Sequence, residues 1–275
     1  MPSELYQPQS TLQALISHMI SQHLLPPLPT AITESFLNID RADFVSPQQL
    51  EKGMQYNDQP LPIGENQTIS APHMHCHSAK LLESYITRPN ARILDVGSGS
   101  GYLSAVFADC ARRTGGGKVL GIEYFQPLVI IGNLNVRKSN PDLLDIVGKS
   151  PALSIIRGDG WHPQSQPLPP PFDADDLKFD CIHVGAAAAS MPEALVALMK
   201  NDSRMLIPIG PEYCGGQFFT QVDKDADGTM HQKELMEVRY VPLIQGGVDT
   251  AGWKEGGNEG GKAGGNKNMS SQSDL

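Results

Sequence analysis

Residues 93–101 read Ile93-Leu94-Asp95-Val96-Gly97-Ser98-Gly99-Ser100-Gly101. The apolar residues at the start predict a short buried strand, and the glycines that follow predict a tight turn. A helix is expected next, from Tyr102 to about residue 111. Glycine lets backbone N–H groups approach a ligand closely, and a helix N-terminus adds further N–H groups at the same point. The stretch therefore predicts a nucleotide-type binding site at the end of a parallel strand.

The glycine spacing distinguishes two kinds of ligand. The dinucleotide fingerprint G-x-G-x-x-G needs a third glycine where this chain has Tyr102, and Gly101 comes one residue too early. The spacing G-x-G-x-G after an acidic strand end is typical of enzymes that use S-adenosylmethionine, a ligand without a pyrophosphate. Its amino-acid end is zwitterionic, and Asp95 is suited to orient it. We favour a methyl donor over NAD; ordinary βα loops with capping acids are the alternative without a ligand.

Two more acidic turns are expected beside this one. Glu123 ends the strand predicted over 118–123, where an acidic side chain can accept hydrogen bonds from both ribose hydroxyls. Asp159 and Gly160 follow the strand predicted over 154–157 and are expected to meet the adenine. Because the carboxyl ends of parallel strands share one edge of a sheet, the three turns predict a single crevice.

Strands and helices alternate from residue 93 onward. This order favours an α/β fold with a doubly wound, mostly parallel sheet and helices on both faces. Two later segments joined by a polar Asp/Gly turn predict a C-terminal antiparallel hairpin. The expected strands are 93–96, 118–123, 154–157, 181–184 and 205–208, the helices 102–111, 127–137 and 192–200, and the hairpin arms 217–222 and 235–243.

The flanking regions predict the domain organisation. Apolar residues between Leu12 and Ile20 recur on one helix face, Thr30 can cap a second helix, and a third is expected over 73–86, after an extended segment. We expect a helical segment over 1–60 packed on the main domain, a catalytic domain over 61–250, and a disordered tail over 251–275 that is poor in apolar residues. The proline-rich stretch 162–176 is predicted to be a surface loop insertion.

The composition narrows the function classes. The 275 residues carry a net charge of −9, which argues against nucleic acid because phosphate binding relies on a basic surface. Four cysteines without CxxC pairing suit a reducing compartment. No apolar run approaches the ~18 residues of a membrane span, and residues 1–30 lack the apolar core of a signal peptide. We expect a cytoplasmic monomer with no nucleic-acid and no membrane partner.

Four further segments resemble one enzyme family. Residues 61–75 read Leu61-Pro62-Ile63-Gly64-Glu65-Asn66-Gln67-Thr68-Ile69-Ser70-Ala71-Pro72-His73-Met74-His75 and look like the signature before the first strand of protein-L-isoaspartate (D-aspartate) O-methyltransferases. Residues 179–188 resemble the fourth-strand segment of that family, and residues 204–210 and Tyr240-Val241-Pro242-Leu243 are similar to its later strands. The similarity runs from about residue 55 to 245.

The resemblance implies a fold, a reaction and a set of site residues. The fold is that of S-adenosylmethionine-dependent methyltransferases, and the reaction is methyl transfer from S-adenosyl-L-methionine to the free carboxylate of L-isoaspartyl residues. The family name adds D-aspartyl residues. The partners implied are isoaspartyl-containing proteins and peptides, which the methyl ester commits to repair through a succinimide. The implied catalytic residue is Ser70. The implied cofactor-binding residues are Gln67, Thr68, Ile69, Ser70, His75, Asp95, Gly97, Ser98, Gly99, Glu123, Asp159 and Gly160.

The chemistry of such a reaction needs few groups. A carboxylate is already ionised at neutral pH, so no general base is required, and the sulfonium donor has a neutral leaving group. What remains is to position the carboxylate and exclude water. A hydroxyl such as that of Ser70 can hold one carboxylate oxygen without neutralising the other. The alternative to a catalytic role is a structural one, in which Ser70 is the N-cap of the next helix. The runner-up function is a small-molecule O-methyltransferase.

Two patterns suggest metals. Residues 223–234 match the EF-hand calcium loop D-x-D-x-D-G-x₅-E at every required position. The same residues fall where the resembled family forms a hairpin, so a calcium-binding module is the less favoured alternative. His73, His75, Cys76 and His77 look like a ligand cluster, but helix residues two apart face different directions, so we expect no metal there.

Overall fold

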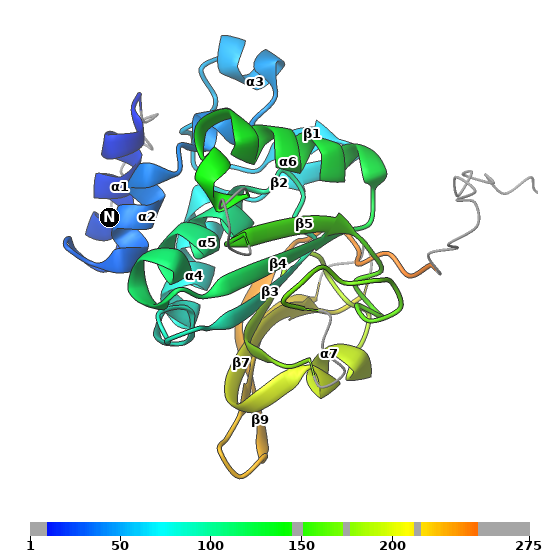
Figure 1. The fold of residues 1–275 in the computed structure, drawn as a ribbon. Helices are drawn as coiled ribbons and strands as arrows, with labels where there is room; N and C mark the ends of the chain where they lie inside the picture. The colour runs from blue at the N-terminus through cyan, green and yellow to red at the C-terminus, as the bar shows by residue number, and fades with distance from the viewer. Residues whose placement is uncertain (1–9, 145–150, 173–176, 212–215, 247–275) are drawn as a thin grey trace, which may run out of the picture.

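The computed structural model describes residues 10–144, 151–172, 177–211 and 216–246, and in this part of the chain one sheet of seven strands organises the molecule (Figure 1). The strand order is β5-β4-β3-β6-β7-β8-β9. The first five strands run parallel, while β8 and β9 are antiparallel. The strands are β3 (Arg92–Val96), β4 (Lys118–Glu123), β5 (Leu153–Arg157), β6 (Phe179–Val184), β7 (Met199–Ile209), β8 (Gln217–Lys224) and β9 (Met230–Val238). The predicted α/β fold with a C-terminal hairpin is confirmed.

The parallel strands are buried on both faces. Every residue of β6 is buried, as expected for a central strand of a sheet covered on both sides. Successive residues of β3 enter different hydrophobic clusters: Ile93 belongs to one and Leu94 to the other. This alternation explains why each predicted strand reads as a short, continuous apolar run.

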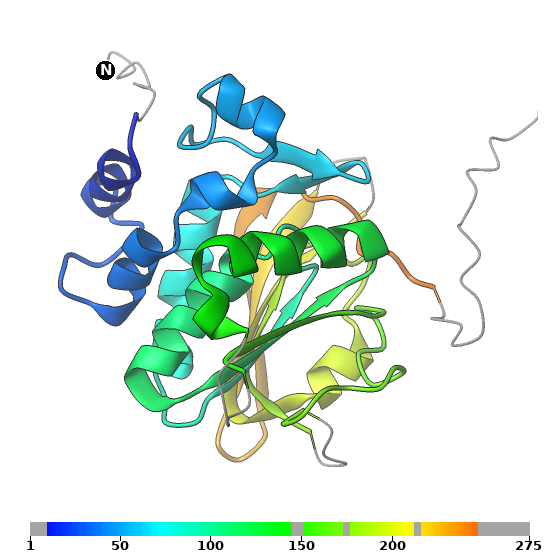
Figure 2. The same cartoon turned by 45° about the horizontal axis from the view of Figure 1, so that its top comes forward.

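Long helices cover one face of the sheet. These are α4 (Pro72–Ile86), α5 (Tyr102–Gly115) and α6 (Gln126–Ser139), with α1 (Leu12–Ser21) and α2 (Ala31–Asn38) packed outside α4 and α5 (Figure 2). The Thr30 side chain accepts from the Thr33 N–H, as an N-cap should. Helix α5 continues beyond the predicted end, until Gly116 adopts a left-handed φ of 72° and terminates it.

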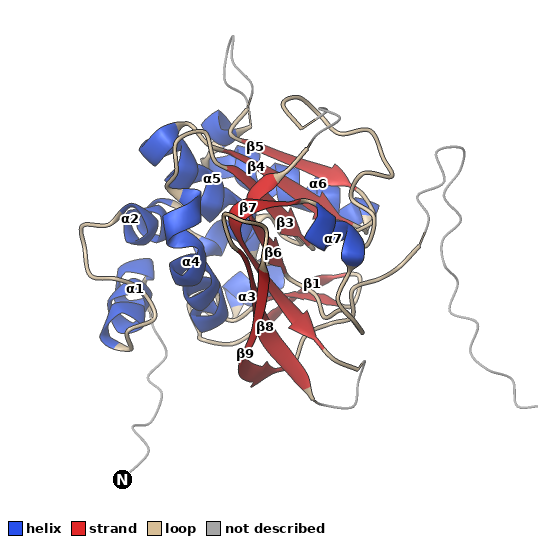
Figure 3. Ribbon diagram, turned by 90° about the horizontal axis from the view of Figure 1, so that it is seen from below, coloured by secondary structure: helices blue, strands red, loops and turns tan. Residues whose placement is uncertain are grey.

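In the described part of the chain, the opposite face of the sheet is covered by one short helix and by a loop. Helix α7 (Glu193–Ala197) is shorter than the predicted 192–200 because β7 already begins at Met199 (Figure 3). The loop after β5 supplies the rest: Phe172 is 1% exposed, and its ring lies 6.0 Å from that of Phe179. The described part of the stretch, 162–172, is a surface loop, as predicted, and the buried side chain of Phe172 anchors it in the core. Residues 173–176 lie outside the described residues, as does the predicted tail from 251.

A short hairpin precedes α4. The segment expected to be simply extended contains 3₁₀-helix η1 (Arg41–Phe44), helix α3 (Pro47–Glu51), and the paired strands β1 (Leu61–Gly64) and β2 (Gln67–Ile69). Its two-residue turn is Glu65-Asn66, with φ of 51° and 56°, the pattern of a type I′ hairpin turn. A further 3₁₀-helix, η2 (Pro141–Leu143), follows α6.

The EF-hand pattern is folded as a β-hairpin. Its turn is closed by the Asp225 N–H, which donates to the Thr229 carbonyl, and by the Gly228 N–H, which donates to the Asp225 carbonyl; the flanking acids lie in the strands. Asp223 pairs with Arg204 at 2.6 Å, whereas Glu234 lies opposite Thr220, about 10 Å further along the ladder. Arg204 binds the Asp223 carboxylate, and the register of β8 with β9 places the Glu234 carboxylate too far from it to bind the same ion. The segment therefore does not form a calcium loop. Among the described residues, no His, Cys, Asp and Glu side chains gather in a way that could hold a metal ion.

None of the described helices is both long and apolar enough to cross a lipid bilayer.

Candidate active site

The candidate site lies at the carboxyl ends of β3 and β6, where the strand order reverses. Such a switch point opens a crevice in parallel sheets. The chain bends sharply there: Gly97, Gly99 and Gly101 have φ of 76°, 53° and 85°, which side chains rarely tolerate. The turn is tied to the neighbouring strand by the Gly185 N–H, which donates to the Val96 carbonyl at 2.8 Å.

Glu123 is fixed beside this turn. It is 5% exposed; its Oε2 accepts from the Gly99 N–H at 2.9 Å, and its Oε1 from the Phe125 N–H at 3.0 Å. Burial raises the pKa of the Glu123 carboxyl, and the backbone donors of Phe125 and Gly99 oppose that rise. Each carboxylate oxygen can accept a further hydrogen bond, so the side chain is pre-oriented for a diol.

Asp95 is committed to protein partners. It is 2% exposed, its Oδ1 lies 2.8 Å from Nδ1 of His183, and its Oδ2 accepts from the Ser104 hydroxyl. The three side chains come from β3, β6 and α5 and join the two strands that form the crevice. Asp95 thus braces the glycine turn from behind.

A small cavity of about 50 Å³ lies above the glycine turn. The β1–β2 hairpin covers it; a Cβ built on Gly99 would be 3.1 Å from Cδ1 of Ile63. Gly160 is packed even more closely, since its Cβ would meet Val96 at 2.5 Å. The cavity lining includes Gln67, Thr68, Gly97, Gly99, Glu123, Gly158, Gly160 and the segment 241–244.

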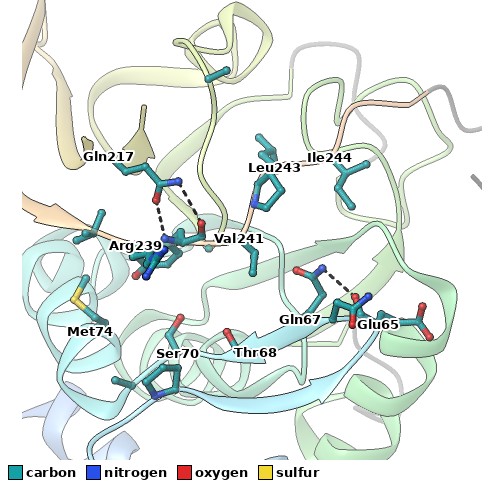
Figure 4. Close-up of a pocket in the computed structure, with 18 of the residues that line it drawn as sticks. Glu65, Gln67, Thr68, Ser70, Met74, Gln217, Arg239, Val241, Leu243 and Ile244 are labelled. Carbon is teal, nitrogen blue, oxygen red and sulfur yellow. Dashed lines mark hydrogen bonds between the residues drawn. The ribbon is translucent and has the colours of Figure 1, made fainter. Parts of the chain in front are cut away.

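A much larger cleft of about 1910 Å³ adjoins this cavity (Figure 4). One wall is formed by β2 and the start of α4, with Ser70, and the other by the end of β9 and residues 239–245. Gln67, Thr68 and residues 241–244 line both spaces, so the cavity and the cleft meet at these residues. Trp161 holds the second wall in place, because its indole N–H donates to the Leu243 carbonyl at 2.9 Å.

Ser70 lies in the cleft wall just before α4. The N-cap of α4 is Ala71, with Pro72 as the first helical residue and no side-chain cap bond. The alternative that made Ser70 a helix cap is therefore wrong. The Ser70 side chain instead lines the cleft, as does that of Tyr240 on the opposite wall.

The predicted cofactor residues fall into three groups, one of which is Ser70 alone, in the wall of the cleft. Gln67, Thr68, Gly97, Gly99, Glu123 and Gly160 line the small cavity. Ile69, His75, Asp95, Ser98 and Asp159 are buried and line neither of the two spaces. His75 in particular lies behind the glycine turn, with Nδ1 3.4 Å from Nη1 of Arg41 and its ring against Tyr102. Burial beside Arg41 holds the pKa of His75 well below its usual value.

Asp159 differs from its expected role in detail. Its Oδ1 accepts from the Trp161 N–H at 2.8 Å, which shapes the turn, while the neighbouring Gly158 and Gly160 face the cavity. Gln166, from the proline-rich loop, supports the same turn, since its Oε1 accepts from the Asp159 N–H at 3.4 Å. The loop thus forms the back of the site.

The residues present fit S-adenosylmethionine. Glu123 offers acceptor oxygens for a ribose, and Gly97, Gly99 and Gly160 line the cavity beside it, where no side chain separates a ligand from the backbone. The cavity alone is smaller than the ~300–1,000 Å³ of ordinary ligand pockets. A nucleoside must therefore extend toward the cleft or move the β1–β2 hairpin.

Sequence reasoning missed several residues that shape the site. Trp161, His183, Gln217 and Tyr240 each make a contact that positions a wall. His183 and Tyr240 stand inside segments that carried the resemblance, which was the available signal. Trp161 and Gln217 had none, since their partners are distant in sequence.

The chain is similar to known proteins of one enzyme family. The family model of Protein-L-isoaspartate(D-aspartate) O-methyltransferase (PCMT) matches residues 10–247. Protein-L-isoaspartate O-methyltransferase 1 of Arabidopsis thaliana is 38% identical over 207 residues, which are 74% of this chain and 80% of that protein. The Protein-L-isoaspartate O-methyltransferase of Triticum aestivum is 40% identical over 215 residues, 77% of this chain and 83% of the relative.

A solved structure supports the same comparison. The beta-aspartate methyltransferase (PCMT) from Plasmodium falciparum, in complex with S-adenosyl-L-homocysteine, superposes with a TM-score of 0.71 at 28% identity. The superposition covers 86% of this chain and 99% of the other.

Proposed function

Because the chain belongs to the protein-L-isoaspartate (D-aspartate) O-methyltransferase family, we infer that it transfers a methyl group from S-adenosylmethionine to the free carboxylate of L-isoaspartyl residues in damaged proteins. The reaction starts the repair of these residues. The observation that carries the inference is the meeting of two spaces at Gln67 and Thr68: a glycine-lined cavity with a ribose-type acceptor, and a cleft with a hydroxyl in its wall.

The size of the cleft favours a peptide acceptor. At about 1910 Å³ it exceeds the ~300–1,000 Å³ of pockets that enclose small ligands. Its walls carry polar, charged and apolar groups, including Ser70, Arg239, Glu237 and Val241, which suits an extended chain with varied side chains. A small-molecule O-methyltransferase would leave most of this surface unused.

The proposed roles of the site residues are to bind the donor and the acceptor and to exclude water. When bound, S-adenosylmethionine supplies an activated methyl group on a sulfonium whose leaving group is neutral. The acceptor carboxylate is ionised at neutral pH, so no side chain has to remove a proton. Glu123 and the glycine turn are proposed to hold the donor, and Ser70 to hold one acceptor oxygen so that the other faces the cavity. The β1–β2 hairpin, through Ile63, excludes water from the glycine turn.

One assay tests the proposed function. Purified protein and labelled donor are mixed with an isoaspartyl peptide and, separately, with its aspartyl twin of the same sequence. We expect methylation of the isoaspartyl peptide and essentially none of the twin, because the acceptor carboxylate differs in position along the backbone. Equal labelling of the two peptides, or labelling of neither, would contradict the proposal.

Replacement of Ser70 tests its proposed role. Ser70→Ala removes one hydrogen bond to a charged group, worth roughly 1.5–3 kcal/mol, so turnover should fall about ten- to a hundredfold. S-adenosylhomocysteine affinity and melting temperature should change little, since Ser70 lines the cleft and Ala71 caps α4. Ser21→Ala, at the end of α1, is the control. A Ser70→Ala protein with normal turnover would remove Ser70 from the acceptor site.

We also propose that the catalytic unit, residues 61–250 with the helical segment 1–60 packed on it, works in the cytoplasm as a monomer without nucleic-acid or membrane partners. The net charge of −9 and the buried, free cysteines Cys76, Cys110 and Cys181 support this. Light scattering should give the mass of one chain, 29.7 kDa. Twice that mass would refute the monomer.

A further inference from the structure

Tyr240 is held in the cleft wall by a buried side chain. Strand β9 ends at Val238, and beyond it the chain loses its regular strand partner. Gln217, which is 4% exposed, takes over: its Oε1 accepts from the Tyr240 N–H at 2.7 Å, and its Nε2 donates to the Tyr240 carbonyl at 3.3 Å (Figure 4). The backbone of Tyr240 is therefore fixed on both sides.

The ring of Tyr240 is fixed as well. It stacks on Phe219 with an interplanar angle of 4° and a centroid distance of 6.5 Å, and Phe219 is itself fully buried. Tyr240 and Ser70 line the cleft from opposite walls, so two hydroxyl-bearing side chains border the same space. Such a backbone clamp and ring stack exceed what is needed to fill space at a partly buried position.

We propose that the Tyr240 phenol is a second hydrogen-bond donor to the acceptor carboxylate, working beside Ser70, and that Gln217 positions it. The proposal rests on the proposed function and adds a residue to its site. Tyr240 would touch the substrate and is in that sense catalytic, whereas Gln217 acts only through Tyr240.

The chemistry of the acceptor explains the pair. An ionised carboxylate only accepts hydrogen bonds, and Ser70 offers a single O–H. A carboxylate entering between the walls can accept from both hydroxyls. With both donors on the same oxygen, the other keeps its lone pairs for the methyl group. The geometry thus separates the oxygen that is held from the oxygen that reacts.

A neutral donor suits this task better than a cation. Burial raises the pKa of Tyr240 to about 12, so the phenol keeps its proton and donates throughout the neutral range. Arg239 also lines the cleft, but a guanidinium tends to bind both carboxylate oxygens at once and would occupy the reacting one. Two hydroxyls hold the group while leaving its charge in place.

The first test removes the phenol and keeps the ring. In Tyr240→Phe we expect kcat/KM for an isoaspartyl peptide to fall about tenfold or more, from the loss of a hydrogen bond to a charged group. S-adenosylhomocysteine affinity and melting temperature should stay near those of the unmodified protein. Tyr85→Phe, which removes a phenol from the outer part of α4, is the matched control. Gln217→Met keeps the side-chain length without the clamp and should lower kcat more than donor affinity.

Two further measurements separate catalysis from structure. In the double variant Ser70→Ala/Tyr240→Phe, the losses should be clearly less than multiplicative if both hydroxyls bind one carboxylate. Incorporation of 3,5-difluorotyrosine at position 240 keeps the shape and makes the phenol more acidic, so kcat/KM should fall as pH rises through the lowered pKa.

Three results would overturn the assignment of Tyr240: unchanged kcat/KM in Tyr240→Phe, a loss of donor affinity and stability that matches the loss of rate, or a pH profile unaffected by fluorination. An unmodified protein that does not methylate the isoaspartyl peptide would refute the proposed function itself. Activity of the unmodified protein together with a fully active Tyr240→Phe would refute only the role of Tyr240.

Discussion

Replacing Glu123 with glutamine is expected to weaken S-adenosylhomocysteine binding about a hundredfold or more. Charge-assisted hydrogen bonds contribute roughly 1.5–3 kcal/mol each, and every 1.4 kcal/mol corresponds to a factor of about ten in affinity. A ribose diol can make two such bonds. The structure adds a second cause: both carboxylate oxygens already accept from backbone N–H groups, of Gly99 and Phe125, so a glutamine amide would turn its NH₂ against one of these donors.

Calorimetry on Glu123→Gln measures this loss, with Glu51→Gln at the end of α3 as a control for the same chemical change. Donor affinity measured against pH gives an independent check. Because burial raises the pKa of Glu123 above its usual 4.5, the charged form is lost as pH falls through that raised value. The unmodified protein should therefore lose donor affinity at a higher pH than an ordinary glutamate would, and Glu123→Gln should lack this dependence. Unchanged binding by Glu123→Gln would remove Glu123 from the donor site.

The local parts of the fold could be predicted from the sequence. The strand before the glycine turn, the turn itself and the strand ending at Glu123 are continuous runs whose residue types decide their conformation. A strand that is buried on both faces needs apolar side chains at successive positions, so the signal lies within a few neighbouring residues. The same locality made the glycine turn and Glu123 readable as parts of one site.

Other parts depend on single contacts between distant residues. Phe172 turns a proline-rich loop into a cover for the sheet by stacking with Phe179, which loop composition does not reveal. The EF-hand pattern matched every position, yet Arg204 holds Asp223 and the hairpin register fixes Glu234 elsewhere. A motif of one segment says nothing about the strand that will pair with it.

The same limit applies within the site. Ser70 was readable from its motif, while Tyr240 on the opposite wall comes from the far end of the fold and is set by Gln217 and Phe219. His75, expected at the cofactor, points instead toward Arg41, because α4 turns that face of the helix to the protein interior. Helix spacing tells which residues share a face, but the direction of that face follows from packing.

Replacement of Asp95 is the second change for which we expect a large effect. Its two possible roles, bracing the glycine turn and binding the ammonium group of the donor, predict different results for the alanine and asparagine variants. In Asp95→Ala, His183 and Ser104 lose their partner in a site that is 2% exposed, and each buried polar group left unsatisfied costs about 1–3 kcal/mol. We expect a loss of this size in the free energy of unfolding, measured by denaturant titration, and weaker donor binding because the glycine turn is no longer braced.

The variant Asp95→Asn separates bracing from charge. An amide has the same shape, its oxygen can still accept from His183, and the Ser104 hydroxyl can rotate to accept from the NH₂. If Asp95 acts by bracing the turn, Asp95→Asn should keep most of the stability and bind S-adenosylhomocysteine within a fewfold of the unmodified protein. If instead its charge holds the ammonium group of the donor, Asp95→Asn should be stable yet bind as weakly as Asp95→Ala. The structure favours bracing, since Asp95 is 2% exposed and lines neither the cavity nor the cleft.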